Sequence, residues 1–421
     1  MTGISVRPYW ELTFDADGDV DTAQRDSLVA GLGTEKTTDL VVFSHGWNSD
    51  RSGATRLYSH FFKPFPGLLR GGTPGVRVGY VGVLWPSMRF SDEPIPDFGP
   101  AAVAAGVVPS TLDQATQAAL AEVFPGREAV VRELADLLEE RPDEDARFAD
   151  YAELVRRLTG IDARAADAPA MLVDDSVAVC EVFAAALEET AAPAPGLLDD
   201  LRKRLWNGAH ELLRQATYFA MKRRAGTVGA NGLGPALGVL AAAHPGIRIH
   251  LVGHSFGGRL VSYALLGLPE GVRNVKSVTL LQGAFSHYAF AGQLPFDRAH
   301  GGALHDAQGR VDGPVVSCYS SHDSALGTMY PLASKLAGDS RSIFELGDRW
   351  GAMGHDGIQA VEPCERLLLA EALRGAFPGS GCVSVDASEV VRSGGPPSGA
   401  HSDICHDELA RVVLRAGRLL G

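Results

Sequence analysis

Short apolar runs that end in polar or glycine-rich turns dominate two parts of the chain, before residue 88 and after residue 225. Asp39–Phe43 is a β-branched apolar run that ends at a Ser-His-Gly turn, and Val76–Leu84 and Ile247–Val252 repeat the pattern. A continuous apolar run of this length is typical of a strand buried on both faces. The same pattern predicts further buried strands at Val275–Leu281, Pro314–Tyr319 and Cys382–Val385.

Helical patterns lie between these runs. They cover Ala54–Phe65, a stretch from residue 256 to Leu266, and a closing amphipathic segment at Ile404–Leu420. Apolar strands that alternate with helices predict an α/β fold with a mostly parallel sheet and helices on both faces. A weaker alternation from Ile4 to Phe14, interrupted by Pro8, predicts an edge strand or hairpin arm.

The strand pattern stops between Ser87 and Gly226. Residues 88–225 are rich in Ala, Leu, Glu and Arg, and Leu198–Arg224 is amphipathic with a period near that of a helix. Gly226 is expected to end that helix. The sequence therefore predicts one α/β domain built from residues 1–87 and 226–421, with residues 88–225 as a large helical insertion.

Composition argues against several classes of partner and site. The 38 Lys and Arg against 51 Asp and Glu give a net charge of −13 without a basic stripe, so no nucleic-acid partner is expected. No apolar stretch approaches the ~20 residues needed to cross a bilayer. The first fifteen residues show no secretory signal, which predicts a cytoplasmic protein. Five scattered cysteines without a C-x-x-C pair predict buried thiols rather than disulfides or a zinc site.

The best chemical motif is the G-x-S-x-G sequence at residues 253–257. It follows a β-branched strand without a gap and opens a helix, which is the context of a nucleophile elbow. Ser255 is therefore the predicted nucleophile. The alternative is a glycine-rich turn in which the serine has no chemical role.

A serine nucleophile needs a base, and the base needs a carboxylate to orient it. Asp323 follows the predicted strand Pro314–Tyr319, and His401 follows the last predicted strand just before the closing helix. The strand Val275–Leu281 ends in Gln282-Gly283 and so offers no carboxylate. The rival acids are Asp306, Asp312, Asp339 and Asp386; the rival bases are His355, which precedes the last strand, and His406, which is expected inside the last helix.

The order Ser, Asp, His resembles that of α/β-hydrolase superfamily serine hydrolases of the esterase and lipase type, over residues ~39–87 and ~226–421. The resemblance implies that the turn at residues 44–47 matches an early His-Gly motif, and that the backbone amides of Trp47 and Phe256 form an oxyanion hole. It also implies that the insertion forms a cap, although its apolar faces equally suit a subunit interface. Candidate pocket residues are His45, Gly46, His254, Trp85 and Phe285.

These observations predict a serine hydrolase that cleaves a carboxylic ester, from a small molecule or a lipid, through a Ser-His-Asp triad and an acyl-enzyme. The chain has no P-loop, no H-E-x-x-H and no dinucleotide-binding motif, so neither a cofactor nor a metal is expected. One alternative is an amide-bond hydrolase or peptidase with the same triad. The other is a non-catalytic binding protein on the same fold.

Overall fold

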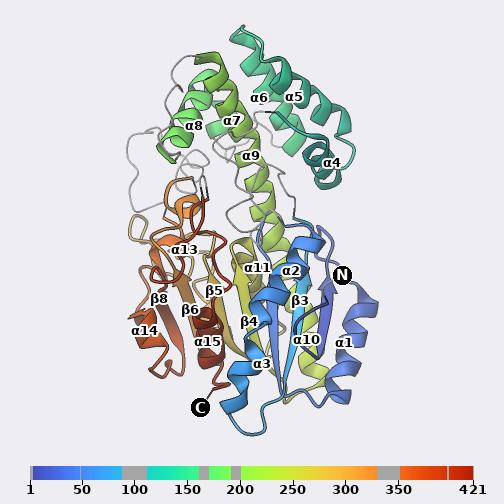
Figure 1. Cartoon of the computed structure of the whole chain (residues 1–421), viewed down its shortest axis with the longest axis vertical. Helices are drawn as coiled ribbons and strands as arrows, with labels where there is room; N and C mark the ends of the chain where they lie inside the picture. Colours follow the sequence, from blue (N-terminus) through green and yellow to red (C-terminus); the bar gives the residue numbers. More distant parts are fainter. Residues whose placement is uncertain are drawn as a thin grey trace.

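A computed structural model of the chain describes residues 3–47, 49–87, 111–160, 170–190, 201–329, 351–395 and 398–420. In these residues eight strands form one sheet in the order β1-β3-β2-β4-β5-β6-β8-β7, and every neighbouring pair is parallel (Figure 1). The α/β class predicted from the sequence is confirmed. The strands are β1 (Tyr9–Thr13), β2 (Asp39–Ser44), β3 (Val78–Leu84), β4 (Arg248–His254), β5 (Val275–Leu281), β6 (Pro314–Tyr319), β7 (Cys364–Leu368) and β8 (Gly381–Asp386).

Helices connect the strands and cover the sheet. In the described residues, the short 3₁₀ segments η1 (Leu69–Gly71) and η4 (Ala307–Arg310) and the π-helical segments η3 (Val228–Leu233) and η5 (Ala325–Met329) accompany the α-helices. The α-helices are α1 (Thr22–Thr34), α2 (Arg51–Phe62), α3 (Phe65–Leu68), α4 (Gln114–Val123), α5 (Glu128–Glu140), α6 (Ala146–Thr159), α7 (Ala170–Val173), α8 (Ser176–Thr190), α9 (Leu201–Thr227), α10 (Gly234–Ala243), α11 (Phe256–Gly267), α13 (Met353–Asp356), α14 (Leu369–Ala372) and α15 (Asp407–Ala416).

The strands are apolar throughout because both faces of the sheet are buried. Successive side chains of a strand point to opposite faces. In β2, Leu40 and Val42 join the apolar cluster formed with α1, α10 and α11, whereas Val41 and Phe43 join the cluster formed with α2, α3 and α15. All four side chains are fully buried. A strand with one wet face would alternate apolar and polar residues instead.

Several predictions at the edges of the fold need correction. β1 is an edge strand, but it pairs in parallel with β3, so the hairpin arm was wrong. The edge strand β7 carries exposed Glu365 and Arg366, and it was not predicted because it has no continuous apolar run. The prediction of five buried thiols was wrong for Cys405, which is exposed, and for Cys364, which is partly exposed.

The helices α4–α8 stand beyond one end of the sheet, and the long helix α9 joins them to it (Figure 1). The predicted end of this helix at Gly226 was wrong, because α9 continues through Thr227 into η3 and α10. Gly226 packs against Tyr263 of α11 within this continuous segment. Apolar side chains of the insertion, such as Phe148 and Trp206, belong to the same cluster as one face of the sheet. None of the described helices is long and apolar enough to cross a membrane.

Candidate active site

The candidate site lies where the chain reverses its course across the sheet. β2 is followed by β3 on one side of it, whereas β4, its neighbour on the other side, is followed by β5 still further away. In parallel sheets, ligands bind at the carboxyl ends of strands at such a switch point. Ser44 at the end of β2 pairs with Gly253 of β4, so the loops after these two strands are adjacent.

The turn between β4 and α11 holds Ser255 in a backbone conformation that side chains rarely adopt. Its φ is 55° and its ψ is −121°. A non-glycine residue in such a region costs on the order of 1–3 kcal/mol, and residues of this kind cluster at active sites and ligand-binding turns. A Cβ atom at Gly257 would lie 2.0 Å from the carbonyl oxygen of Ser44, so only glycine lets α11 begin this close to β2. The motif thus forms a strand–turn–helix with Ser255 at the turn.

The structure brings the predicted nucleophile, base and acid together. His401 Nε2 lies 2.9 Å from Ser255 Oγ, and His401 Nδ1 lies 2.7 Å from Asp323 Oδ2. Because Nδ1–H donates to the carboxylate, Nε2 is the nitrogen that can accept the serine proton. The Asp323 side chain is fully buried, whereas the His401 side chain is 15% exposed. The carboxylate is therefore sealed from water, whereas the imidazole remains accessible.

The rival acids and bases have other partners. The prediction that His406 lies inside the last helix was wrong, because it precedes α15 as its N-cap residue. Asp339 lies outside the described residues. The others pair as follows: Asp306 with His305, Asp312 with Lys276, His355 with Asp356, His406 with Asp403, and Asp386 with the amide of Ser388.

The amide of Phe256 is suited to an oxyanion. Phe256 is the first residue of α11, so its N–H has no acceptor within the helix and lies at the positive end of the helix dipole. It directly follows Ser255. This is the place at which a developing negative charge on a bound carbonyl oxygen would be stabilised.

The loop after β2 is held against Ser255 from several sides. The His45 amide donates to Tyr58 Oη at 2.9 Å, and Trp85 Nε1 donates to the His45 carbonyl at 3.0 Å. His45 Nδ1 donates to the Gly46 carbonyl at 2.8 Å and so fixes the peptide that carries the Trp47 amide. A Cβ atom at Gly46 would lie 2.7 Å from Ser255 Cβ, which requires glycine at this close approach.

Of the remaining candidate pocket residues, His254 and Trp85 hold neighbouring residues of the site in place, and Phe285 lies in the core. His254 Nε2 donates to the His401 carbonyl at 2.9 Å. Burial lowers the pKa of His254 to about 3 and that of His45 to about 4, so both rings are neutral at neutral pH and serve as donors rather than bases. Trp85 stacks on His45 with ring centroids 5.5 Å apart. Phe285 is 1% exposed and lies in the core.

Two residues that sequence reasoning missed also belong to this site, one beside Asp323 and one beside Trp47 and Phe256. Gln282 Nε2 lies 3.2 Å from Asp323 Oδ2, although the sequence showed only that its position offers no carboxylate. The Tyr218 ring of α9 lies 4.5 Å from Phe256 and 5.5 Å from Trp47 between centroids. In the sequence, Tyr218 was one of several apolar positions of an amphipathic helix. No local signal distinguished it.

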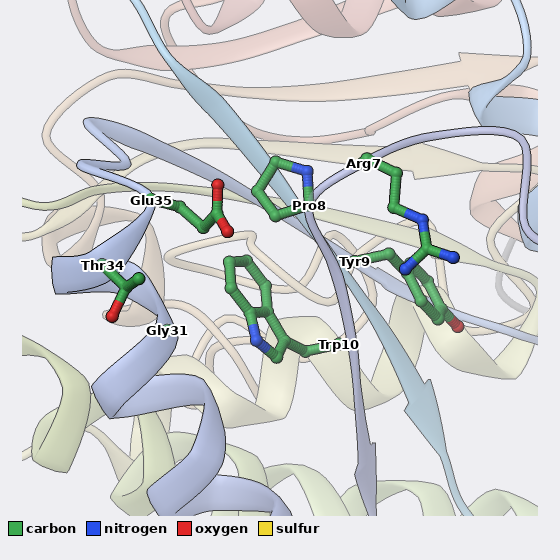
Figure 2. A pocket seen from close by; sticks show the side chains of 7 residues that line it. All are labelled: Arg7, Pro8, Tyr9, Trp10, Gly31, Thr34 and Glu35. Atoms are coloured by element: carbon green, nitrogen blue, oxygen red, sulfur yellow. The ribbon is translucent and has the colours of Figure 1, made fainter.

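A separate pocket lies at the opposite end of the strands. It is lined by residues 7–10 at the start of β1 and by Gly31, Thr34 and Glu35 at the end of α1 (Figure 2). Because parallel strands share one direction, this pocket is at the amino end of the sheet and apart from Ser255. In the described part of the chain, no group of three His, Cys, Asp or Glu residues could hold a metal ion.

Comparison with protein families, with curated proteins and with solved structures finds no match for this chain. The assignment of a function therefore depends on the geometry of the site.

Proposed function

We propose that this protein is a serine hydrolase that cleaves a carboxylic ester through Ser255, His401 and Asp323, the proposed triad. The observation that carries the proposal is the continuous pair of hydrogen bonds from Ser255 Oγ to His401 and from His401 to Asp323, at 2.9 and 2.7 Å. A second observation supports the proposal: Ser255 has a positive φ, which presents its hydroxyl at a strained turn before a helix N-terminus. Strain of this kind is retained where it serves chemistry.

The proposed reaction has two steps. In the first, Ser255 Oγ bonds to the ester carbonyl carbon while His401 Nε2 takes the serine proton, and the alcohol then leaves with that proton. In the second, water attacks the acyl-enzyme, His401 again takes and returns a proton, and the acid departs. The amides of Trp47 and Phe256 stabilise the oxyanion in both steps, and Asp323 stabilises the imidazolium.

We further propose that residues 1–87 and 226–421 form an α/β-hydrolase catalytic domain, with residues 88–225 as a cap over its site. Support comes from the order of the three triad residues along the chain, Ser255 after β4, Asp323 after β6 and His401 after β8, and from Tyr218 of α9, which packs on both proposed oxyanion residues. The substrate is then a small-molecule or lipid ester bound between cap and sheet.

Covalent labelling and a substrate panel test this function. A fluorophosphonate should label the protein at Ser255, located by peptide mapping, and Ser255→Ala should abolish labelling. Ser262→Ala is the matched control, because Ser262 lies on α11 and donates to the Gly258 carbonyl. In p-nitrophenyl esters of graded chain length beside matched anilides, faster ester turnover supports an esterase. Equal anilide turnover would assign an amide-bond hydrolase. A folded protein that is neither labelled nor active would be a binding protein.

A further inference from the structure

Gln282 combines two unfavourable features beside the acid of the proposed triad. It directly follows β5 with a φ of 48°, a conformation that is strained for a residue other than glycine. Its side chain is 1% exposed, and its amide oxygen Oε1 has no hydrogen-bond partner in the described part of the chain. A buried acceptor without a donor lowers stability and calls for an explanation.

The other end of the same amide supplies that explanation. Gln282 Nε2 lies 3.2 Å from Asp323 Oδ2, the oxygen that also accepts from His401 Nδ1. The amide must present its nitrogen here, because an oxygen would repel the carboxylate. The second carboxylate oxygen, Oδ1, accepts from the Leu326 amide at 3.0 Å. The backbone of Gln282 is anchored in turn, since its N–H donates to the Cys318 carbonyl at 3.1 Å.

We infer that Gln282 is a positioning residue, whose Nε2–H donates to the fully buried Asp323 and turns Oδ2 toward His401. The inference rests on the proposed function, since it assigns a role toward the same triad. A buried carboxylate is stable as an anion only when donors surround it. Gln282 acts through Asp323 and does not itself meet the substrate.

Two substitutions of similar length test the inference. Gln282→Met removes the donor, and we expect kcat to fall about tenfold with KM unchanged, because orientation of the base matters in the transition state. The rate of fluorophosphonate labelling at Ser255 should fall in parallel. Gln24→Met makes the same chemical change on α1, where Gln24 Oε1 accepts from the Thr13 amide, and should leave both rates unchanged.

Gln282→Glu gives a signature that a packing role would not produce. Two carboxyl groups at this distance share one proton at low pH, so the new carboxylic acid in Gln282→Glu would then donate to Asp323, and kcat should stay near the parental value at pH 6. As pH rises the shared proton is lost, and kcat should fall to or below that of Gln282→Met by about pH 9. The titratable groups around the pair are His401, His254 next to it, and His355, which interacts with Asp323.

The outcomes separate this inference from the proposed function. If the parental protein is labelled at Ser255 but Gln282→Met has parental kcat and labelling rate, the positioning role is wrong and the proposed function stands. A Gln282→Glu profile that follows the parental one from pH 6 to 9 also overturns the positioning role. Failure of labelling in the parental protein removes the proposed function itself. Because Gln282→Glu retains a donor at low pH, it provides a folded variant even if Gln282→Met does not fold.

Discussion

The His250 imidazole is held between Asp39 and Ser277 at distances close to those that hold His401 in the proposed triad. Its Nε2 lies 3.0 Å from Asp39 Oδ1, and its Nδ1 lies 2.9 Å from Ser277 Oγ. This buried trio (Asp39, His250 and Ser277) thus has the same residue types, although the two ring nitrogens have exchanged partners: His250 faces its aspartate through Nε2 and its serine through Nδ1, whereas His401 faces Asp323 through Nδ1 and Ser255 through Nε2. Its three members are at most 1% exposed, whereas the His401 side chain is 15% exposed.

The two sets differ in where the sheet places them. Members of the buried trio lie within β2, β4 and β5, where a serine is in extended backbone and covered by helices on both faces. Ser255 lies on a turn past the end of β4, next to the first amide of α11. Three hydrogen-bonded side chains are therefore no evidence of catalysis by themselves. Access at the carboxyl edge and a donor for the oxyanion are what distinguish a reactive set.

Burial and hydrogen bonds together set the protonation states of His250 and Asp39 in the buried trio. Burial lowers the pKa of His250, so the ring is neutral, donates from Nε2 to Asp39 and accepts from Ser277 at Nδ1. Burial alone would raise the pKa of Asp39, but hydrogen bonds from His250 and Thr38 hold it below its ordinary value. The trio therefore links three neighbouring strands and contributes to stability.

Substituting His401 and His250 in separate variants should give the largest contrast between activity and stability. His401→Ala removes the general base, so we expect kcat/KM for an ester to fall by three or more orders of magnitude. His250→Leu should retain the specific activity of the folded enzyme but lose roughly 3 kcal/mol of unfolding free energy, because Asp39 loses a buried partner. Steady-state kinetics and urea denaturation measure both. A dead but fully stable His250→Leu would contradict the comparison.

Substituting Asp323 and Asp39 should likewise separate activity from stability, with a somewhat smaller effect on turnover than His401→Ala has. Asp323→Asn keeps the shape of the side chain but no longer selects the tautomer with Nδ1–H, and we expect kcat to fall on the order of 10³- to 10⁴-fold. Asp39→Asn should change stability only. Hydrolysis rates and denaturation curves of the two variants, compared at one pH, test this. Parental turnover in Asp323→Asn would show that another carboxylate orients the base.

Acid should destabilise the fold through its buried neutral histidines. Because the pKa of each is lower in the folded than in the unfolded state, the unfolded chain binds more protons below about pH 6.5, and stability falls as pH drops through this region. For pKa values of about 4 for His45 and 3 for His254, we expect about 2 kcal/mol from each between pH 7.5 and 5. The pKa of His355 is raised by its hydrogen bond to Asp356 and gives an opposite contribution.

Substitution of His250 isolates its share of this acid sensitivity. His250→Leu should show a smaller loss of unfolding free energy between pH 7.5 and 5 than the parental protein, measured by urea denaturation at each pH. His300→Leu removes a histidine whose side chain is 74% exposed and serves as the control. An unchanged pH slope in His250→Leu would mean that His250 is not neutral in the folded state.

The smallest expected effect concerns Tyr218 of α9, which packs beside the proposed active site. Tyr218→Leu removes the ring that packs on Trp47 and Phe256, and we expect the preference between short and long p-nitrophenyl esters to shift about fivefold, equivalent to ~1 kcal/mol in transition-state binding. Tyr151→Leu alters an aromatic residue that packs on Trp206 within the insertion. It should leave the preference unchanged. An unchanged ratio in Tyr218→Leu would show that α9 does not line the site.

Local patterns in the sequence determined most of the strands and the turn that holds Ser255. The predicted strands at β5 and β6 match the structure residue for residue, because an apolar run with turn residues at both ends encodes burial on both faces. The elbow was also readable, since its glycines and serine lie within five consecutive residues. β7 and the end of α9 were missed, because an exposed edge strand and a continuous helix past a glycine give no local signal.

Tertiary structure alone decided which side chains meet. Ser255 and His401 are 146 residues apart, and His401 and Asp323 are 78 apart, so their contact depends on the order of strands in the sheet. The sequence placed Asp323 and His401 after strands but could neither find the donor Gln282 nor reveal a second, buried trio. The physical reason is that periodicity and turn residues report burial and local backbone geometry. Hydrogen bonds between distant strand ends arise only when two apolar cores fix the strands side by side.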